Sequence, residues 1–204
     1  MIEVYRALFP GQKFIELAHR IDKETSGLLI LAKSRASLLA MHDLFKHVSA
    51  RSIDKKYKAL VIGKWPYGEH LETSSIQVDS SSKVKVSVSN DESAKKAKTL
   101  IKPLAFYHFE GKDYTLVEAK LLTGRMHQIR VHLSNLGYPI VGDRRYGDFK
   151  ENRRLKQMLK INRLFLHAFY TDFYLSVTKK TYNFKLDLSN DLQHCIEQLT
   201  SIQP

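Results

Sequence analysis

The segment His19–Gly27, with the sequence HRIDKETSG, contains the residues whose types and order are best suited to chemistry. Its aspartate, Asp22, lies between two cationic residues, and a Thr-Ser-Gly sequence follows shortly after it. Hydroxyl and backbone N–H groups in a turn of this kind can hold a carboxylate in place. An aspartate in such a loop most often only caps a turn, so this spacing alone does not indicate catalysis.

A second segment, Gly124–His132 (GRMHQIRVH), brings together Arg, His and Gln side chains that could face Asp22. His127, Arg130 and Ser134 recur at helical spacing, on a different stripe from the apolar residues of the same helix. We therefore expect Arg130 to point away from the core on which this helix packs. A carboxylate that faces a fixed cationic side chain is a candidate for a catalytic or binding site.

Three histidines invite a metal or acid–base interpretation: His19, His127 and His167. Their separations match no zinc spacing, so we expect structural hydrogen bonds from them and no metal or cofactor. The single cysteine, Cys195, cannot form an internal disulfide, which is typical of a reducing cytoplasm.

The elements that must position these segments follow an α+β pattern dominated by strands. Helices are predicted from Ser34 to about Val48, from Arg125 to Leu136, within 148–163, and from Ser189 or Asn190 to Leu199. Strands are predicted over 56–65, 84–89, 98–109, 114–122, 165–175 and 182–188, with a hairpin turn at 110–113 and a loop or mobile tip at 79–83. We find no repeat and no linker, and expect one domain over residues 1–204.

Charge narrows the class of partner. The chain has 204 residues and a formal net charge of +12, which favours a polyanion because neutralising phosphates releases counterions. The alternative is a soluble protein with a basic surface and no polyanionic partner. Net charge affects association with other molecules and does not indicate the fold. The sequence has no secretory signal and no apolar run long enough to cross a membrane. We expect a monomeric cytoplasmic protein that binds RNA.

Both segments resemble motifs of the RluA-type pseudouridine synthases, which convert uridine to pseudouridine within RNA without a cofactor. HRIDKETSG resembles His-Arg-Leu-Asp-x-x-Thr-Ser-Gly, and residues 124–148 resemble Gly-Arg-Thr-His-Gln-Ile-Arg-Val-His through Gly-Asp-x-x-Tyr-Gly. Residues 55–57 (KKY) are similar to a Lys-x-Tyr element and residues 162–168 (NRLFLHA) to an Arg-Leu-x-Leu-His-Ala strand. The matches cover nearly the whole chain and favour the branch that acts on large-subunit ribosomal RNA.

The resemblance implies a mixed, mostly antiparallel sheet with flanking helices, and a role for each matching residue. Asp22 would act at C1′ of the target uridine, either as a nucleophile or through a glycal-like route. Tyr57 would stack on the uracil and take part in proton removal at C5. Arg130 would pair with Asp22 and keep it ionised, because a nearby cation lowers a carboxyl pKa by about 1 to 3 units.

A stacked uridine must be flipped out to reach such a site, at a cost of a few kcal/mol. Arg20 is expected to fill the vacated space or hold the flipped backbone. Phosphate and other RNA contacts are expected from Lys55, Lys56, Arg125, His127, Gln128, Arg144, Arg145, Arg153 and Arg154. An apolar wall that excludes water is expected from Ile21, Leu164 and Leu166.

The chain departs from the family pattern in three respects. Ile21 replaces Leu, a volume-conserving change, and Met126 replaces a Thr whose hydroxyl could cap the helix start. The family's opening strand with its Lys-Pro-x-Gly-like segment, and the N-terminal RNA-binding domain of many relatives, are not found before His19, so we expect a catalytic fragment. The alternatives are an RNA-binding or ribosome-assembly module without catalysis, a base-removing N-glycosidase, and a synthase directed at transfer RNA.

Overall fold

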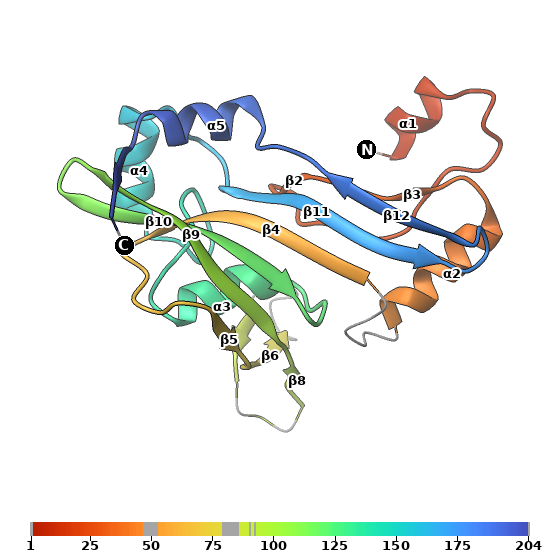
Figure 1. Cartoon of the computed structure of the whole chain (residues 1–204), viewed down its shortest axis with the longest axis horizontal. Helices are drawn as coiled ribbons and strands as arrows, with labels where there is room; N and C mark the ends of the chain where they lie inside the picture. Colours follow the sequence, from red (N-terminus) through yellow and green to blue (C-terminus); the bar gives the residue numbers. More distant parts are fainter. Residues whose placement is uncertain (1, 47–52, 79–85, 90, 92, 204) are drawn as a thin grey trace.

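The computed structural model describes residues 2–46, 53–78, 86–89, 91 and 93–203. Its main sheet runs in the order β12-β11-β4-β10-β9-β13, and these five pairings are antiparallel. The strands of this path are β4 (Ile53–Ile62), β9 (Thr99–Phe109), β10 (Lys112–Leu121), β11 (Leu166–Leu175), β12 (Lys180–Lys185) and β13 (Thr200–Ile202). The predicted mixed, mostly antiparallel sheet is confirmed (Figure 1).

Short strands extend this sheet and form two smaller ones. β2 (Ser26–Gly27) pairs with β11 in parallel, and β5 (His70–Glu72) pairs with β9. β1 (Glu16–Leu17) and β3 (Leu31–Ala32) form a separate pair. A three-stranded sheet contains β6 (Ser75–Val78), β7 (Val86–Val88) and β8 (Lys95–Lys96), and it projects beside α3 (Figure 1).

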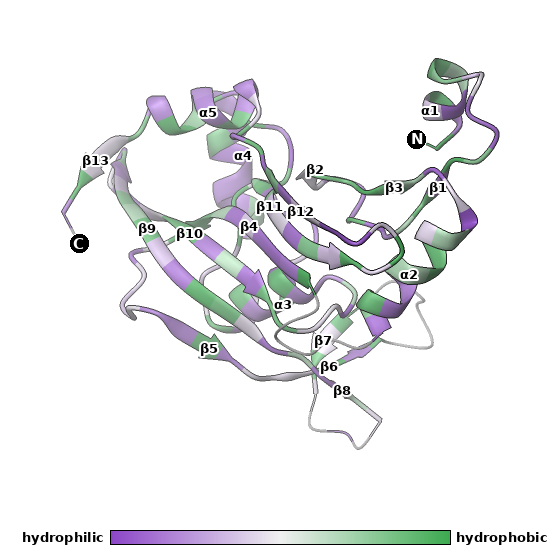
Figure 2. Cartoon of the chain, turned by 45° about the vertical axis from the view of Figure 1, so that its right-hand side comes forward, coloured by the Kyte–Doolittle hydropathy of each residue, from purple (hydrophilic) through white to green (hydrophobic). Residues whose placement is uncertain are grey.

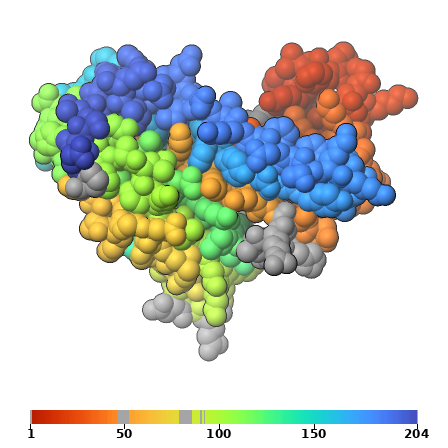
Figure 3. Space-filling view, in the orientation of Figure 1, coloured from red at the N-terminus to blue at the C-terminus, as the bar shows by residue number. Residues whose placement is uncertain are grey.

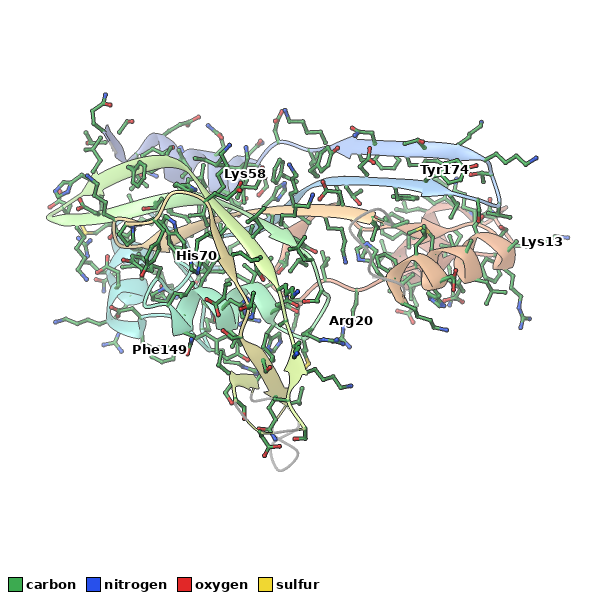
Figure 4. All side chains as sticks on the ribbon, turned by 60° about the horizontal axis from the view of Figure 1, so that its bottom comes forward. Lys13, Arg20, Lys58, His70, Phe149 and Tyr174 are labelled. Atoms are coloured by element: carbon green, nitrogen blue, oxygen red, sulfur yellow. The ribbon has the colours of Figure 1, made fainter. Side chains whose placement is uncertain are left out.

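Helices cover both faces of the main sheet. They are α1 (Ile2–Leu8), α2 (Arg35–Lys46), α3 (Gln128–Asn135), α4 (Phe149–Met158) and α5 (Asn190–Glu197). α2 and α3 lie on one face and α5 on the other (Figures 1 and 4). α4 and α5 alternate between hydrophilic and hydrophobic residues, as helices that cover a sheet do (Figure 2). α1 has no buried residue and protrudes from the body (Figure 3).

The core is centred on β4 and β10, where the sheet is covered on both sides. Ala59 and Val61 of β4 are fully buried on one face, and the paired residues Leu60 of β4 and Leu116 of β10 are buried on the other. Such central strands carry apolar residues on both faces, whereas a half-covered strand alternates. A second cluster joins Met41 of α2 to the far end of β11, so the core anchors α2 against the same sheet.

Most predicted elements are present, with shifted ends. Ser34 caps α2, because its Oγ accepts the N–H of Ser37 at 3.1 Å. The predicted hairpin is β9–β10, and its turn is only Glu110-Gly111, both with positive φ, as a two-residue type I′ turn requires. Val48 and the tip at 79–83 lie outside the described residues.

Other boundaries were wrong by several residues. The strand predicted over 56–65 is β4, which ends at Ile62 because Gly63 turns the chain with φ 104°. The helix predicted from Arg125 begins at Gln128. The pattern over 182–188 belongs to β12, which begins and ends earlier. The short elements α1, β1, β2, β3, β5, β6, β8 and β13 were not predicted.

Candidate active site

A cavity of about 480 Å³ is lined by residues of α2, β4 and α3, among others. Asp22, Tyr57 and Arg130 all line it. They come from the loop after β1, from β4 and from α3, so the fold brings together three residues that are far apart in the sequence.

The Asp22 loop is fixed against β11. The N–H of Leu28 donates to the Ala168 carbonyl at 2.8 Å, and β2 pairs with β11 beside it. Gly27 has φ 108°, and a Cβ there would lie 2.1 Å from the Ala168 carbonyl oxygen. Ser26 Oγ lies 2.8 Å from His167 Nδ1. The Ser-Gly that follows Asp22 therefore permits a close approach that no larger residue allows.

Arg130 is the centre of a buried ion-pair network. Its Nε and Nη2 donate to the two carboxylate oxygens of Asp143 at 2.8 and 2.9 Å, and its Nη1 donates to Asp22 Oδ2 at 3.2 Å. The two-point contact with Asp143 fixes the plane of the guanidinium, which leaves the third nitrogen directed at Asp22.

Arg130 does not point into solvent as a residue on an outward helix stripe would. Only 7% of its surface is exposed, because the loop after Asp143 covers this side of α3. The Tyr146 ring centre lies 5.0 Å from the guanidinium carbon, and Ser134 Oγ donates to the Tyr146 carbonyl. The predicted second stripe exists, but it faces protein.

Asp143 is the residue that sequence reasoning missed. It is 1% exposed, and its carboxylate also accepts the backbone N–H groups of Arg145 and Tyr146. Gly142 before it has φ 76°, and a Cβ there would lie 1.9 Å from the Arg163 carbonyl oxygen. The signal was the Gly-Asp pair in the second motif, to which no role was given.

Electrostatics fix the charge states in this network. Burial opposes the ionised form of Asp143, but the Arg130 hydrogen bonds and two backbone N–H groups outweigh it and hold its pKa below the usual range. Burial likewise opposes the Arg130 cation, but Asp143 and Asp22 raise its pKa. Burial, and then the Asp22 charge, raise the pKa of Tyr57, so its phenol stays protonated.

His127 and Gln128 build the start of α3. His127 has φ 55°, an unusual conformation for a residue with a side chain, and its Nδ1 lies 2.7 Å from the Tyr146 hydroxyl. The Gln128 oxygen accepts from Thr123 Oγ1 and the Arg125 N–H, and its amide donates to Lys98 and Thr99. Both amide hydrogens are used, so Gln128 holds the loop and does not present free donors to RNA.

The predicted basic contacts separate into two groups. Arg20, Lys55 and Arg125 line the cavity. Arg20 extends from the loop below the sheet, whereas Lys58 lies above it (Figure 4). Lys56 also points to that far face, where it pairs with Glu118 at 3.2 Å, because neighbouring side chains in a strand alternate. Lys56 is therefore not beside Asp22.

Other predicted contacts lie outside the cavity. Arg144 and Arg145 are exposed on the loop after Asp143, and Arg144 donates to the Asn162 carbonyl at 2.7 Å. Arg153 is exposed on α4, and Arg154 there contacts Glu151 at 2.7 Å.

Two of the three residues predicted for the apolar wall lie at the cavity. Ile21 and Leu166 line the cavity, but Leu164 is fully buried in the core, just before β11. Phe45, Met126 and Ile129 are among the other apolar residues that line it. Met126 thus contributes a wall where the family has a hydroxyl.

Of the other two histidines singled out in the sequence, His167 contacts Ser26 as described above, and His19 also forms a hydrogen bond. His19 Nε2 accepts the N–H of Ile30 at 3.1 Å, and burial followed by the nearby Lys55 lowers its pKa to about 4. In the described part of the chain, no cluster of His, Cys, Asp or Glu has the arrangement of a metal site. Nor is any described helix long and apolar enough to span a membrane.

The charge around the cavity is strongly positive. Among the described residues that line it, one is acidic, Asp22, and five are basic: Arg20, Lys46, Lys55, Arg125 and Arg130. A basic, partly apolar cavity around one carboxylate suits an anionic ligand that also buries part of its surface against apolar side chains.

The fold and the site agree with those of a known protein family. The profile of the RNA pseudouridylate synthase family matches residues 5–135. The chain therefore belongs to this family. The predicted family resemblance is confirmed.

Relatives of known name agree. Ribosomal large subunit pseudouridine synthase C of Buchnera aphidicola subsp. Schizaphis graminum is 43% identical over 175 residues, which are 82% of this chain and 51% of that protein. The protein of the same name from Haemophilus influenzae is 36% identical over 202 residues, 98% of this chain and 59% of that protein. The chain thus spans little more than half the length of these relatives.

A solved structure shows the same fold. The human protein RNA pseudouridylate synthase domain containing 1 superimposes with a TM-score of 0.80 at 26% identity, over 97% of this chain and 77% of that one.

Proposed function

We propose that this protein converts uridine to pseudouridine within RNA. The observation that carries the proposal is the contact between Arg130 Nη1 and Asp22 Oδ2 at 3.2 Å, in a cavity that Tyr57 also lines. Family membership and the positive charge around the cavity support it.

In the proposed reaction, Asp22 acts at C1′ while the N1–C1′ bond of the target uridine breaks. The carboxylate is 22% exposed, which leaves it accessible to a bound ribose, and Arg130 orients it. The freed uracil stays on the apolar wall formed with Ile21 and Leu166, turns, and forms a new bond from C5 to C1′. The proton on C5 then leaves and N1 gains one, so the product is an isomer of the substrate.

Tyr57 acts in this scheme as a neutral stacking surface. Its raised pKa makes an ionised phenol unfavourable, so it is suited to holding the uracil and donating a hydrogen bond, and is a poor base for the C5 proton. Of the two roles that the family resemblance implies for Tyr57, we therefore propose stacking on the uracil and not removal of the C5 proton.

The proposed substrate is large-subunit ribosomal RNA, because the named relatives are ribosomal large subunit synthases. Arg20 and Arg125 would contact the flipped nucleotide, and Arg144 and Arg145 the surrounding backbone. We further propose that residues 1–204 form one domain, since the main sheet joins segments from residue 26 to residue 202, and that it acts as a monomer in the cytoplasm.

The test uses transcribed 23S ribosomal RNA tritiated at uracil C5. Tritium release without free uracil is the expected result. Free uracil would indicate an N-glycosidase, and neither product would indicate an RNA-binding module; both contradict the proposal. Asp22→Asn should abolish release while RNA affinity stays within about tenfold, because phosphate contacts dominate affinity.

A further inference from the structure

Lys55 lines the cavity but has no part in the proposed bond-breaking steps. It points to the same face of β4 as Tyr57, since alternate side chains of a strand share a face. Its Nζ lies 4.8 Å from the centre of the Phe45 ring of α2, and the His19 ring centre lies 5.3 Å from the same ring. The ammonium is therefore held on an aromatic surface beside the site of reaction.

Lys55 forms no ion pair and no hydrogen bond with any residue that the structure describes. Other basic residues do: Arg130 contacts two carboxylates, and Lys56 pairs with Glu118. A partly buried ammonium with only an aromatic face beside it lacks the counter-charge that such groups normally have. An anion entering the cavity would supply it.

Among the residues that the structure describes around Lys55, none offers it a free counter-charge. The described titratable and charged groups that line the cavity with it are His19, Arg20, Asp22, His42, Lys46, Tyr57, Arg125, His127 and Arg130. Asp22 is the acid in this set, and Arg130 already binds it. Burial lowers the pKa of Lys55 to about 8, as expected for a cation without an anionic partner.

We propose that Lys55 binds a backbone phosphate next to the flipped uridine. The inference rests on the proposed function for the identity of the ligand. A phosphate offers a charged acceptor to an ammonium that has none, whereas a uracil carbonyl offers a neutral and weaker one.

This arrangement couples RNA affinity to pH. In the free protein Lys55 loses its proton near pH 8, and a bound phosphate raises that pKa. Affinity is then constant below pH 8 and falls above it, because deprotonation competes with binding. Linkage gives a loss of about tenfold between pH 7 and pH 9.

The experiment measures binding without turnover. The Asp22→Asn protein, which holds RNA without converting it, is titrated with transcribed 23S ribosomal RNA at pH 7 to 9 and at several salt concentrations. Lys55→Met in this background should bind RNA more weakly at pH 7, and its RNA affinity should lack the decrease above pH 8 that Lys55 causes. The slope of log affinity against log salt concentration should be smaller by about one. Lys55→Arg should keep the affinity and the salt slope at every pH, since a guanidinium does not titrate there.

Lys46→Met is the matched control, because Lys46 lines the same cavity but is exposed at the end of α2. Lys46→Met should leave the pH dependence of RNA affinity unchanged. Any pH effect that comes from titration of the RNA bases is the same for all variants and is removed by comparing them. Circular dichroism checks that each variant folds; the wild-type pH profile and Lys55→Arg test the proposal even if Lys55→Met does not fold.

Three results would overturn the proposal: an affinity that is constant from pH 7 to 9, a pH dependence that survives in Lys55→Met, or weaker binding with an unchanged salt slope, which would indicate a base contact. A Lys55-dependent pH profile without tritium release from the wild type would leave this inference standing and refute the proposed reaction.

Discussion

At the scale of single residues, the site depends on how one arginine is held. All three guanidinium nitrogens of Arg130 donate hydrogen bonds to carboxylates. Two of these bonds go to Asp143 and one goes to Asp22. Because Asp143 is buried and bound by two backbone N–H groups, it sets the position of the guanidinium before any substrate arrives. Asp143 is thus a positioning residue that acts through Arg130.

Asp143→Asn should lower the rate of tritium release by about 100-fold, because small displacements of catalytic groups have effects of that order. RNA affinity should change little, so the loss appears in kcat and not in KM. Removing one partner of a buried ion pair also lowers the free energy of unfolding, by about 3–5 kcal/mol. Thermal denaturation and single-turnover assays on the folded protein separate the two effects.

Glu151→Gln is the control for this prediction. Glu151 is also 1% exposed and ion-paired, with Arg154 and Lys112, but it does not line the cavity. It should lose stability and keep its kcat. An equal loss of kcat in both variants would mean that Asp143 acts only through stability.

At the scale of elements, the sequence predicted best where local signals decide the structure. The β9–β10 hairpin follows from Glu110-Gly111 between apolar runs, and α2 follows from its serine cap and apolar spacing. β2 and β13 are too short for a pattern and form only because β11 and β9 offer free edges.

The residues of the site could be predicted from the sequence only where they belong to a recognised motif. Asp22, Tyr57 and Arg130 came from motif order, while the partnership of Arg130 with Asp143 depends on a loop that no periodicity describes. Strand alternation alone predicts that Lys56 lies on the opposite face of β4 from Lys55 and Tyr57.

Gly27→Ala should displace the Asp22 loop. A Cβ would meet the Ala168 carbonyl, and the backbone has a φ that suits glycine, so the β2–β11 pairing must open. We expect tritium release to fall by about 100-fold or more. Gly111→Ala is the matched control: its φ is also positive, but nothing lies within 4 Å, so it should cost only about 1 kcal/mol of stability and no activity. Normal turnover in Gly27→Ala would contradict the proposed role of this contact.

At the scale of the whole molecule, a net charge of +12 makes the fold depend on a few buried carboxylates. Glu151 joins α4 to the β9–β10 hairpin by accepting the Tyr114 hydroxyl at 2.5 Å and binding Arg154 and Lys112. Burial opposes its ionisation, but these donors outweigh it and lower its pKa to about 2.

A carboxylate with a depressed pKa in the folded state contributes stability that is complete above its ordinary value of 4.5 and disappears as pH falls toward 2. The melting temperature should therefore decrease through this range, and it should decrease less steeply in Glu151→Gln, which is less stable at pH 7 but has no such proton to gain. Calorimetry of both proteins from pH 7 to pH 2 measures the difference. Parallel curves would show that acid unfolding originates elsewhere, for example in Asp143, whose pKa is also depressed and whose protonation would release Arg130.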